Sequence, residues 1–371
     1  MNNTISKIKK YCPVWTLIVL GFALLSLILH IAIITNEGFA DWHNNHTAFY
    51  IRWFLAKITG IFPFSLAEIV VATIPVWFVL AVIFIIKVSK QGIVKMIRLA
   101  CSMLAVLMIF YSLYVLMYAA GFNNPTLDLK MEFDKQPVSA KQLQKTAVQL
   151  TNEINKLVDK IEYEDKSFSK MPYSLDEMNK RLIGAYKNAS EKYSFIKTFS
   201  SRFKPIILSE PLTYTHISGI YSYLTGESNI NTNFPDYTLP YTAAHELAHQ
   251  RGFSREDEAN FIAFLVCSES DDDYIKYSGY VGMYEYVVSA LNSASRDMYL
   301  EIGYDLDIRV RYEMQAYNDF FEKYRGSVAS KISGAVNDTV IKIQGDPDGE
   351  KSYGLTVDLA VAYYKNLGLL D

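Results

Sequence analysis

The residues with the clearest chemical potential form the pattern His-Glu-x-x-His, at His245, Glu246 and His249. In an α-helix, side chains four positions apart lie on one face, so both imidazoles can reach the same metal ion. Two histidines and a third protein ligand leave one tetrahedral position of Zn²⁺ for a water molecule. Glu246 stands next to the first histidine, where its carboxylate can accept a proton from that water. Because the chain contains only 6 histidines, this spacing predicts a zinc site.

A third ligand is expected from the segment that follows the second histidine. Gly252 is a natural end for the first helix. Ser254 can cap a second helix, whose first turn contains Glu256, Asp257 and Glu258. A glutamate of this turn would be close enough along the chain to complete the site. Acidic residues also stabilise a helix N-terminus electrostatically, which alone would explain their presence. The identity of the third ligand therefore stays open at this point.

Three apolar stretches precede this site and predict helices that span a membrane. They cover residues 13–35, 64–86 and 97–122, and each is long enough to cross a hydrocarbon core of about 30 Å. We therefore expect residues 1–122 to form a membrane domain and residues 123–371 to form a second domain outside the bilayer. The loop between the first two spans is rich in aromatic residues, which is typical of a segment at the membrane interface.

Lysine and arginine residues are distributed unevenly around the three spans. Three lysines precede the first span, and four basic residues lie between the second and third spans or at the edge of the third, whereas the first loop has only Arg52 and Lys57. By the positive-inside rule, the N-terminus and the second loop are cytoplasmic. We expect a multi-pass protein of the plasma membrane whose C-terminal domain lies outside the cytoplasm. The net charge of −3 predicts no nucleic-acid partner; the expected partners are the lipid bilayer and a peptide or protein substrate.

Between residues 206 and 234 the pattern changes from helices to short strands and turns. An extended segment here would lie shortly before the zinc helix. Its residues are Ser228, Asn229, Ile230 and Asn231. At the edge of a sheet, such a strand could hold a peptide substrate through main-chain hydrogen bonds, although a structural hairpin without a ligand would give the same pattern. Elsewhere the outer domain has helical periodicity, so the expected fold is mainly α with a small β element.

Three longer segments carry a resemblance to a known family. They are Tyr-x-Tyr-Leu-Thr-Gly-Glu-Ser-Asn-Ile-Asn at residues 221–231, Leu-Pro-Tyr-Thr-Ala-Ala-His-Glu-Leu-Ala-His-Gln-Arg-Gly-Phe at 239–253 and Glu-Asp-Glu-Ala-Asn-Phe at 256–261. With the three spans, they resemble the bacterial membrane-protein family known as domain of unknown function 3810 over nearly the whole chain. That family has no assigned substrate, so the resemblance implies an architecture and no activity.

The segment at residues 256–263 also resembles the second motif of glutamate-zincin peptidases, Glu-x-x-Ala-Asp/Asn. This resemblance implies a zincin-like α+β domain in which Glu256 is the third zinc ligand and Asn260 supports a ligand histidine. Glu256 follows His249 by only seven residues, whereas many of those peptidases have a longer insertion. Glu258 therefore stays an alternative ligand.

The function that these features favour is a membrane-anchored zinc metallopeptidase. Zinc would activate a water molecule for attack on a peptide carbonyl, with Glu246 as the general base. Tyr353, near the C-terminus, is a candidate to donate a hydrogen bond to the resulting oxyanion. The alternative is a non-catalytic zinc-binding ectodomain that acts as a membrane sensor or scaffold. Glu246 favours the enzyme, because a structural zinc site needs no general base.

Overall fold

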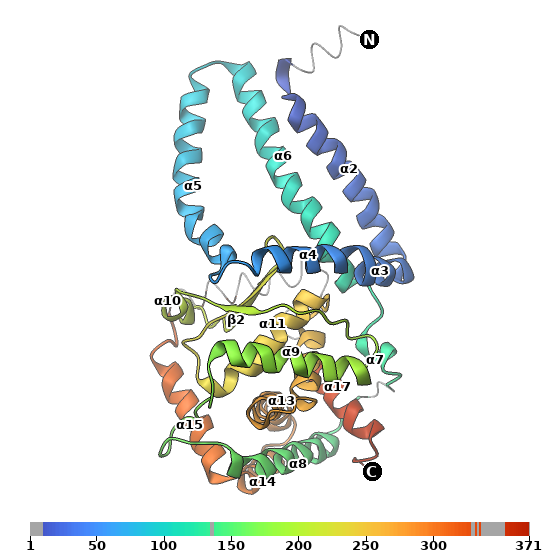
Figure 1. Ribbon diagram of the computed structural model, residues 1–371, viewed down its shortest axis with the longest axis vertical. Coiled ribbons are helices and arrows are strands. Elements are labelled where there is room, and N and C mark those ends of the chain that lie inside the picture. The colour runs from blue at the N-terminus through green and yellow to red at the C-terminus, as the bar shows by residue number, and fades with distance from the viewer. Residues whose placement is uncertain (1–9, 134–136, 328–330, 332–333, 335–352, 371) are drawn as a thin grey trace.

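The computed structural model describes residues 10–133, 137–327, 331, 334 and 353–370. The described chain is mainly helical and contains one small three-stranded sheet, which confirms the predicted fold class. Three long helices form one end of the molecule, and a helical body that includes the sheet forms the other (Figure 1).

The three long helices are α2 (Val14–Thr35), α5 (Leu66–Ser89) and α6 (Ile93–Met117). Each is long and apolar enough to cross a membrane. Large apolar side chains are exposed along α5 in particular, an arrangement that is unfavourable in water and suits a lipid environment. Helix α2 packs along α6, whereas α5 diverges from α6 (Figure 1). The third helix ends earlier than predicted and is followed by a short 3₁₀ turn, η2 (Ala119–Phe122).

The loop between the first two long helices folds into α3 (Glu37–His43), a π-helical turn η1 (Asn44–Ala48) and α4 (Phe49–Thr59). These elements lie across the ends of the long helices and separate them from the helical body (Figure 1). Arg52 of α4 is almost fully buried, and its guanidinium donates a hydrogen bond of 2.7 Å to the carbonyl oxygen of Met117. The aromatic loop is therefore an ordered layer between the two ends of the molecule.

The remaining α-helices of the described chain form the helical body. They are α7 (Leu127–Lys130), α8 (Ala140–Leu157), α9 (Leu175–Lys192), α10 (Ser209–Thr213), α11 (Leu239–Arg251), α12 (Glu256–Ser268), α13 (Asp273–Ala294), α14 (Arg296–Asp305), α15 (Ile308–Glu322) and α17 (Tyr353–Asn366), with 3₁₀ turns η3 (Val158–Lys160) and η4 (Asp236–Thr238). Every residue of α12 between 257 and 267 is buried, and the helix packs against α9, α11, α13 and α17. A helix that is apolar around most of its circumference requires such enclosure.

The sheet consists of β1 (Phe203–Pro205), β2 (Gly219–Ser222) and β3 (Glu227–Ile230), in the order β1-β3-β2. Strand β3 pairs in parallel with β1 and antiparallel with β2. The prediction that residues 228–231 form an edge strand for substrate is therefore wrong, because both edges of β3 are paired and its residues are buried. The unexpected partner is β1, which occupies the second edge. Strands β1 and β2 are the edge strands instead.

A buried ion pair connects the sheet with the beginning of α5. The Lys204 ammonium of β1 contacts the Glu227 carboxylate of β3 and donates a hydrogen bond of 2.7 Å to the carbonyl oxygen of Thr59. The same carboxylate accepts a hydrogen bond of 2.8 Å from the backbone N–H of Ala67, at the N-terminus of α5. Nearby, Glu68 accepts hydrogen bonds from two backbone N–H groups of the loop after β1. These contacts fix the helical body to the second long helix.

Glu227→Gln is expected to lower the free energy of unfolding by about 3–5 kcal/mol, because it leaves the buried Lys204 ammonium without its counter-charge. Chemical unfolding of the full-length protein in detergent would measure the loss. Glu210→Gln is the matched control, since Glu210 pairs with Lys323 on the exposed surface and its removal should change stability little. Equal stability of the two variants would contradict a structural role for the buried pair.

Candidate metal centre

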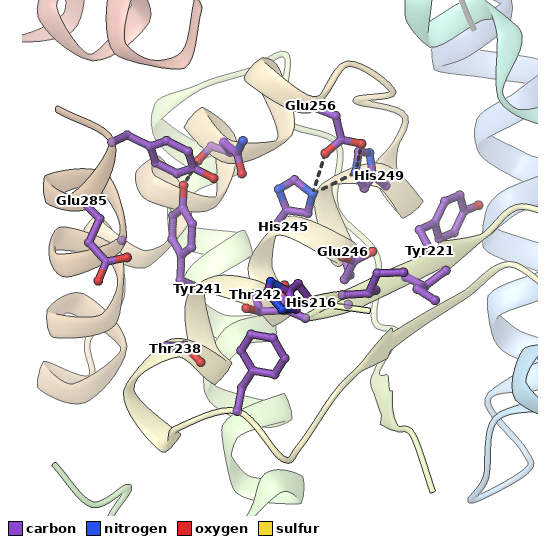
Figure 2. A pocket seen from close by; sticks show the side chains of 18 of the residues that line it. His216, Tyr221, Thr238, Tyr241, Thr242, His245, Glu246, His249, Glu256 and Glu285 are labelled. Atoms are coloured by element: carbon purple, nitrogen blue, oxygen red, sulfur yellow. Dashed lines mark hydrogen bonds and ion pairs between the residues drawn. The ribbon is translucent and has the colours of Figure 1, made fainter. Parts of the chain in front are cut away.

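Three side chains with metal-binding atoms meet where α11 and α12 adjoin: His245, His249 and Glu256 (Figure 2). The Nε2 atoms of the two histidines are 3.0 Å apart. The carboxylate oxygens of Glu256 lie 3.3 Å from His245 Nε2 and 3.4 Å from His249 Nε2. Ligand atoms bonded to one tetrahedral zinc ion lie about 3.3 Å from each other. The three side chains are therefore already spaced as ligands of a single ion.

The bend between the two helices brings Glu256 back to the histidines. Helix α11 ends at Gly252, whose φ of 105° is a left-handed conformation that favours glycine. A Cβ atom at Gly252 would lie 2.5 Å from Arg52 Nη2 and 2.7 Å from Asn44 Oδ1. Asn44 also donates a hydrogen bond of 3.0 Å to the carbonyl oxygen of Gly252. Residues of the loop between α2 and α5 thus hold the bend that brings the candidate metal ligands together.

A backbone carbonyl sets the orientation of His249. The Nδ1 atom of His249 lies 2.7 Å from the carbonyl oxygen of Phe253, so Nδ1 carries a proton and donates it to this bond. Nε2 then faces the cluster, and in the neutral imidazole its lone pair is free for a metal ion, as in most metal-binding histidines. Burial alone would lower the pKa of His249, but the charge and hydrogen bond of Glu256 and the charge of Glu246 raise it to about 9. The carboxylates of Glu256 and Glu246 therefore favour a positive charge at the His249 side chain.

The two candidate third ligands have different surroundings. Burial would raise the pKa of Glu256, but the charges and hydrogen bonds of His249 and His245 hold that pKa well below its usual range. Glu258 points away from the cluster and accepts a hydrogen bond of 2.9 Å from the backbone N–H of Leu127, and burial raises its pKa to about 7. The structure therefore brings Glu256, and not Glu258, to the histidines.

Glu246 lies beside the three clustered side chains and is not one of them. It is 5% exposed, and it borders a cavity of 960 Å³ on which His245, His249 and Glu256 also open. Strand β2 passes so close that a Cβ atom at Gly219 would lie 2.5 Å from Glu246 Oε1. Burial raises the pKa of Glu246 to about 6, against the opposing effects of the two histidines and of a hydrogen bond from the backbone of Tyr221. Its carboxylate is thus held at the cavity wall between β2 and the two histidines.

Within the part of the chain that the structure describes, one edge of β2 has no strand partner, and β2 forms part of the same cavity wall. The carbonyl oxygen of Ser218 accepts a hydrogen bond of 2.7 Å from the backbone N–H of Asn231, next to β3. Because main-chain bonds alternate along an antiparallel pair, the backbone groups of Gly219 and Tyr221 face the unpaired edge. The strand edge that adjoins Glu246 is therefore in β2.

Two other residues predicted for the site are Asn260 and Tyr353. Asn260 lines the cavity, but among the described residues its side chain forms no hydrogen bond with either histidine, because His245 Nδ1 has no partner and His249 Nδ1 faces the carbonyl oxygen of Phe253. The side chain of Tyr353 lies outside the described residues, and its predicted role at the oxyanion stays a prediction.

Tyr118, which lies at the end of α6, could not be identified from its place in the sequence. Its hydroxyl oxygen is 3.4 Å from His249 Nδ1, and its ring meets the imidazole edge-on at a centroid distance of 6.3 Å. The chain has 27 tyrosines, and this one is 131 residues away from the histidine that it contacts. Only the folded arrangement of the membrane helices against α11 identifies it.

A family model described as "Protein of unknown function (DUF3810)" matches residues 45–361, a range that includes every residue of the metal centre. No curated protein and no solved structure matches the chain.

Proposed function

Because the chain belongs to the DUF3810 family, whose function is unknown, we propose from its metal centre that it is a membrane-anchored zinc metallopeptidase. The observation that carries this proposal is the tetrahedral spacing of His245 Nε2, His249 Nε2 and the Glu256 carboxylate, beside a cavity that Glu246 also borders. A structural metal site would need neither an adjoining cavity nor the nearby carboxylate of Glu246.

The ligand atoms fit zinc. Two imidazole nitrogens and one carboxylate are a common ligand set of catalytic zinc, and they leave a coordination position open. When bound, zinc lowers the pKa of water and polarises a carbonyl group. Glu246 accepts the proton of the attacking water at its carboxylate and passes that proton to the leaving nitrogen. Phe253 supports this chemistry indirectly, since its carbonyl accepts the Nδ1 proton of His249 and directs Nε2 toward the cluster.

The edge of β2 that has no strand partner among the described residues supports a peptide as the substrate. Gly219 presents a backbone donor and acceptor at this edge and Tyr221 a backbone acceptor, while the Tyr221 N–H donates a hydrogen bond to Glu246. An extended peptide can add to such an edge as a further strand, with its side chains alternately facing the cavity and the solvent. A carbonyl group of that peptide would then pass beside the metal centre.

The proposal can be tested with a mixture of unstructured peptides, the full-length protein in detergent and mass spectrometry of the products. We expect new peptide termini with zinc-loaded protein, no products after chelation, and recovery of the products when zinc is restored. An absence of products from every peptide would favour the non-catalytic zinc-binding ectodomain, acting as a membrane sensor or scaffold.

We also propose that the helical body lies outside the cytoplasm. The reason is that most of the basic residues next to the long helices lie at the helix ends that are remote from the body. In a background without Cys12 and Cys101, Lys187→Cys in α9 should react with a membrane-impermeant thiol reagent in intact cells. Lys90→Cys, between α5 and α6, should react only after permeabilisation. Cys267 is buried and should contribute little signal. The reverse pattern of labelling would place the metal centre in the cytoplasm.

A further inference from the structure

The cavity contains a carboxylate that the proposed reaction does not use, Glu285 of α13. It lies on the helix that faces His245 across the cavity (Figure 2). Its hydrogen-bond partner is the Tyr237 hydroxyl, at a long distance of 3.5 Å. Within the described part of the chain, no Lys, Arg or His side chain forms an ion pair with it, and burial raises its pKa to about 7. A cation placed here would stabilise the ionised carboxylate.

Tyrosine rings surround this carboxylate. Tyr237, Tyr241 and Tyr317 line the same cavity, from η4, α11 and α15. Burial first, and then the charge of Glu285, raise the pKa of Tyr237 and Tyr317 above the usual value. Both rings are therefore neutral at physiological pH. The faces of neutral aromatic rings attract ammonium and guanidinium groups, most strongly where water is excluded.

The charges around the cavity are unbalanced even with a metal ion. The described residues that line it include Glu246, Glu256 and Glu285 but no lysine or arginine. A divalent cation at the metal centre would balance two negative charges. The ionised carboxylate of Glu285, on the opposite wall, would still have no counter-charge. We infer that Glu285 and the tyrosines form a subsite for the cationic side chain of a lysine or arginine in the peptide substrate. This inference rests on the proposed function, which supplies the peptide.

A pair of probes that differ in charge tests the subsite directly. N-acetyl-argininamide and N-acetyl-citrullinamide have nearly the same size and shape, but only the first is cationic. Calorimetric titration of full-length protein in detergent, with and without a chelator, should show about tenfold tighter binding of the arginine probe. Glu285→Gln should remove this difference. Glu322→Gln, which deletes the same charge from the exposed face of α15, should retain it.

The outcomes separate this inference from the proposed function. Equal binding of the two probes to the wild type would overturn the subsite, and this comparison does not depend on the folding of any variant. A preference that survives in Glu285→Gln would overturn it as well. Hydrolysis of peptides without a preference for basic residues would contradict the subsite and leave the peptidase intact. Charge-selective binding without any hydrolysis would support the subsite and contradict the peptidase.

Discussion

Glu246→Gln is expected to reduce peptide hydrolysis by at least about a hundredfold, the lower end of what a general base contributes. Glutamine has the size of glutamate and can keep the hydrogen bond to the backbone of Tyr221 through its amide oxygen. It cannot accept the proton of the attacking water. Initial rates of cleavage of a peptide that the wild type hydrolyses would measure the loss.

The same variant should keep its zinc and its fold, because Glu246 is not one of the three clustered side chains. Elemental analysis and thermal unfolding are the matching measurements. Glu322→Gln, remote from the cavity, controls for the change in net charge and should hydrolyse the peptide at the wild-type rate. If cleavage survives in Glu246→Gln with zinc in place, Glu246 is not the general base.

His249→Ala is expected to abolish stoichiometric zinc binding, because it removes one of three ligands. His216→Ala provides a matched control. His216 also lines the cavity, but its Nε2 atom lies 3.2 Å from the carbonyl oxygen of Tyr324 and it does not belong to the cluster. Zinc content of the purified variants, measured by elemental analysis, should fall in His249→Ala alone.

The two candidate third ligands can be compared in the same way. Glu256→Gln should weaken zinc binding, since it replaces an ionised ligand with a neutral amide. Glu258→Gln should leave zinc content near the wild-type value, because Glu258 faces the backbone of Leu127. A greater loss of zinc in Glu258→Gln, or full occupancy in His249→Ala, would assign the site to other residues.

The parts of the site that could be predicted from the sequence are those set by local geometry. The four-residue spacing of His245 and His249 places both on one face of a helix, and Gly252 ends that helix as expected. Glu256 begins the next helix, so a single bend returns it to the histidines. Hydropathy likewise predicted the three long helices, because the length and the apolar character of a span are properties of one continuous segment.

Contacts between distant segments could not be predicted in this way. The pairing of β3 depends on β1, a three-residue strand too short to show a period, and the edge strand was therefore assigned to the wrong segment. The buried Arg52 shows no signal in the sequence either, although it packs against the bend at Gly252 about 200 residues later. Glu285 was also missed, because only folding places its helix across the cavity from His245.

The most direct test of the metal centre is X-ray absorption spectroscopy at the zinc edge, combined with zinc analysis, on the full-length protein in detergent. We expect about one zinc per chain, bound by two imidazole nitrogens and by oxygen at about 2.0–2.2 Å, with no sulfur at about 2.3 Å. A folded protein that takes up no stoichiometric zinc, or whose zinc has sulfur ligands, would contradict a catalytic zinc centre formed by His245, His249 and Glu256.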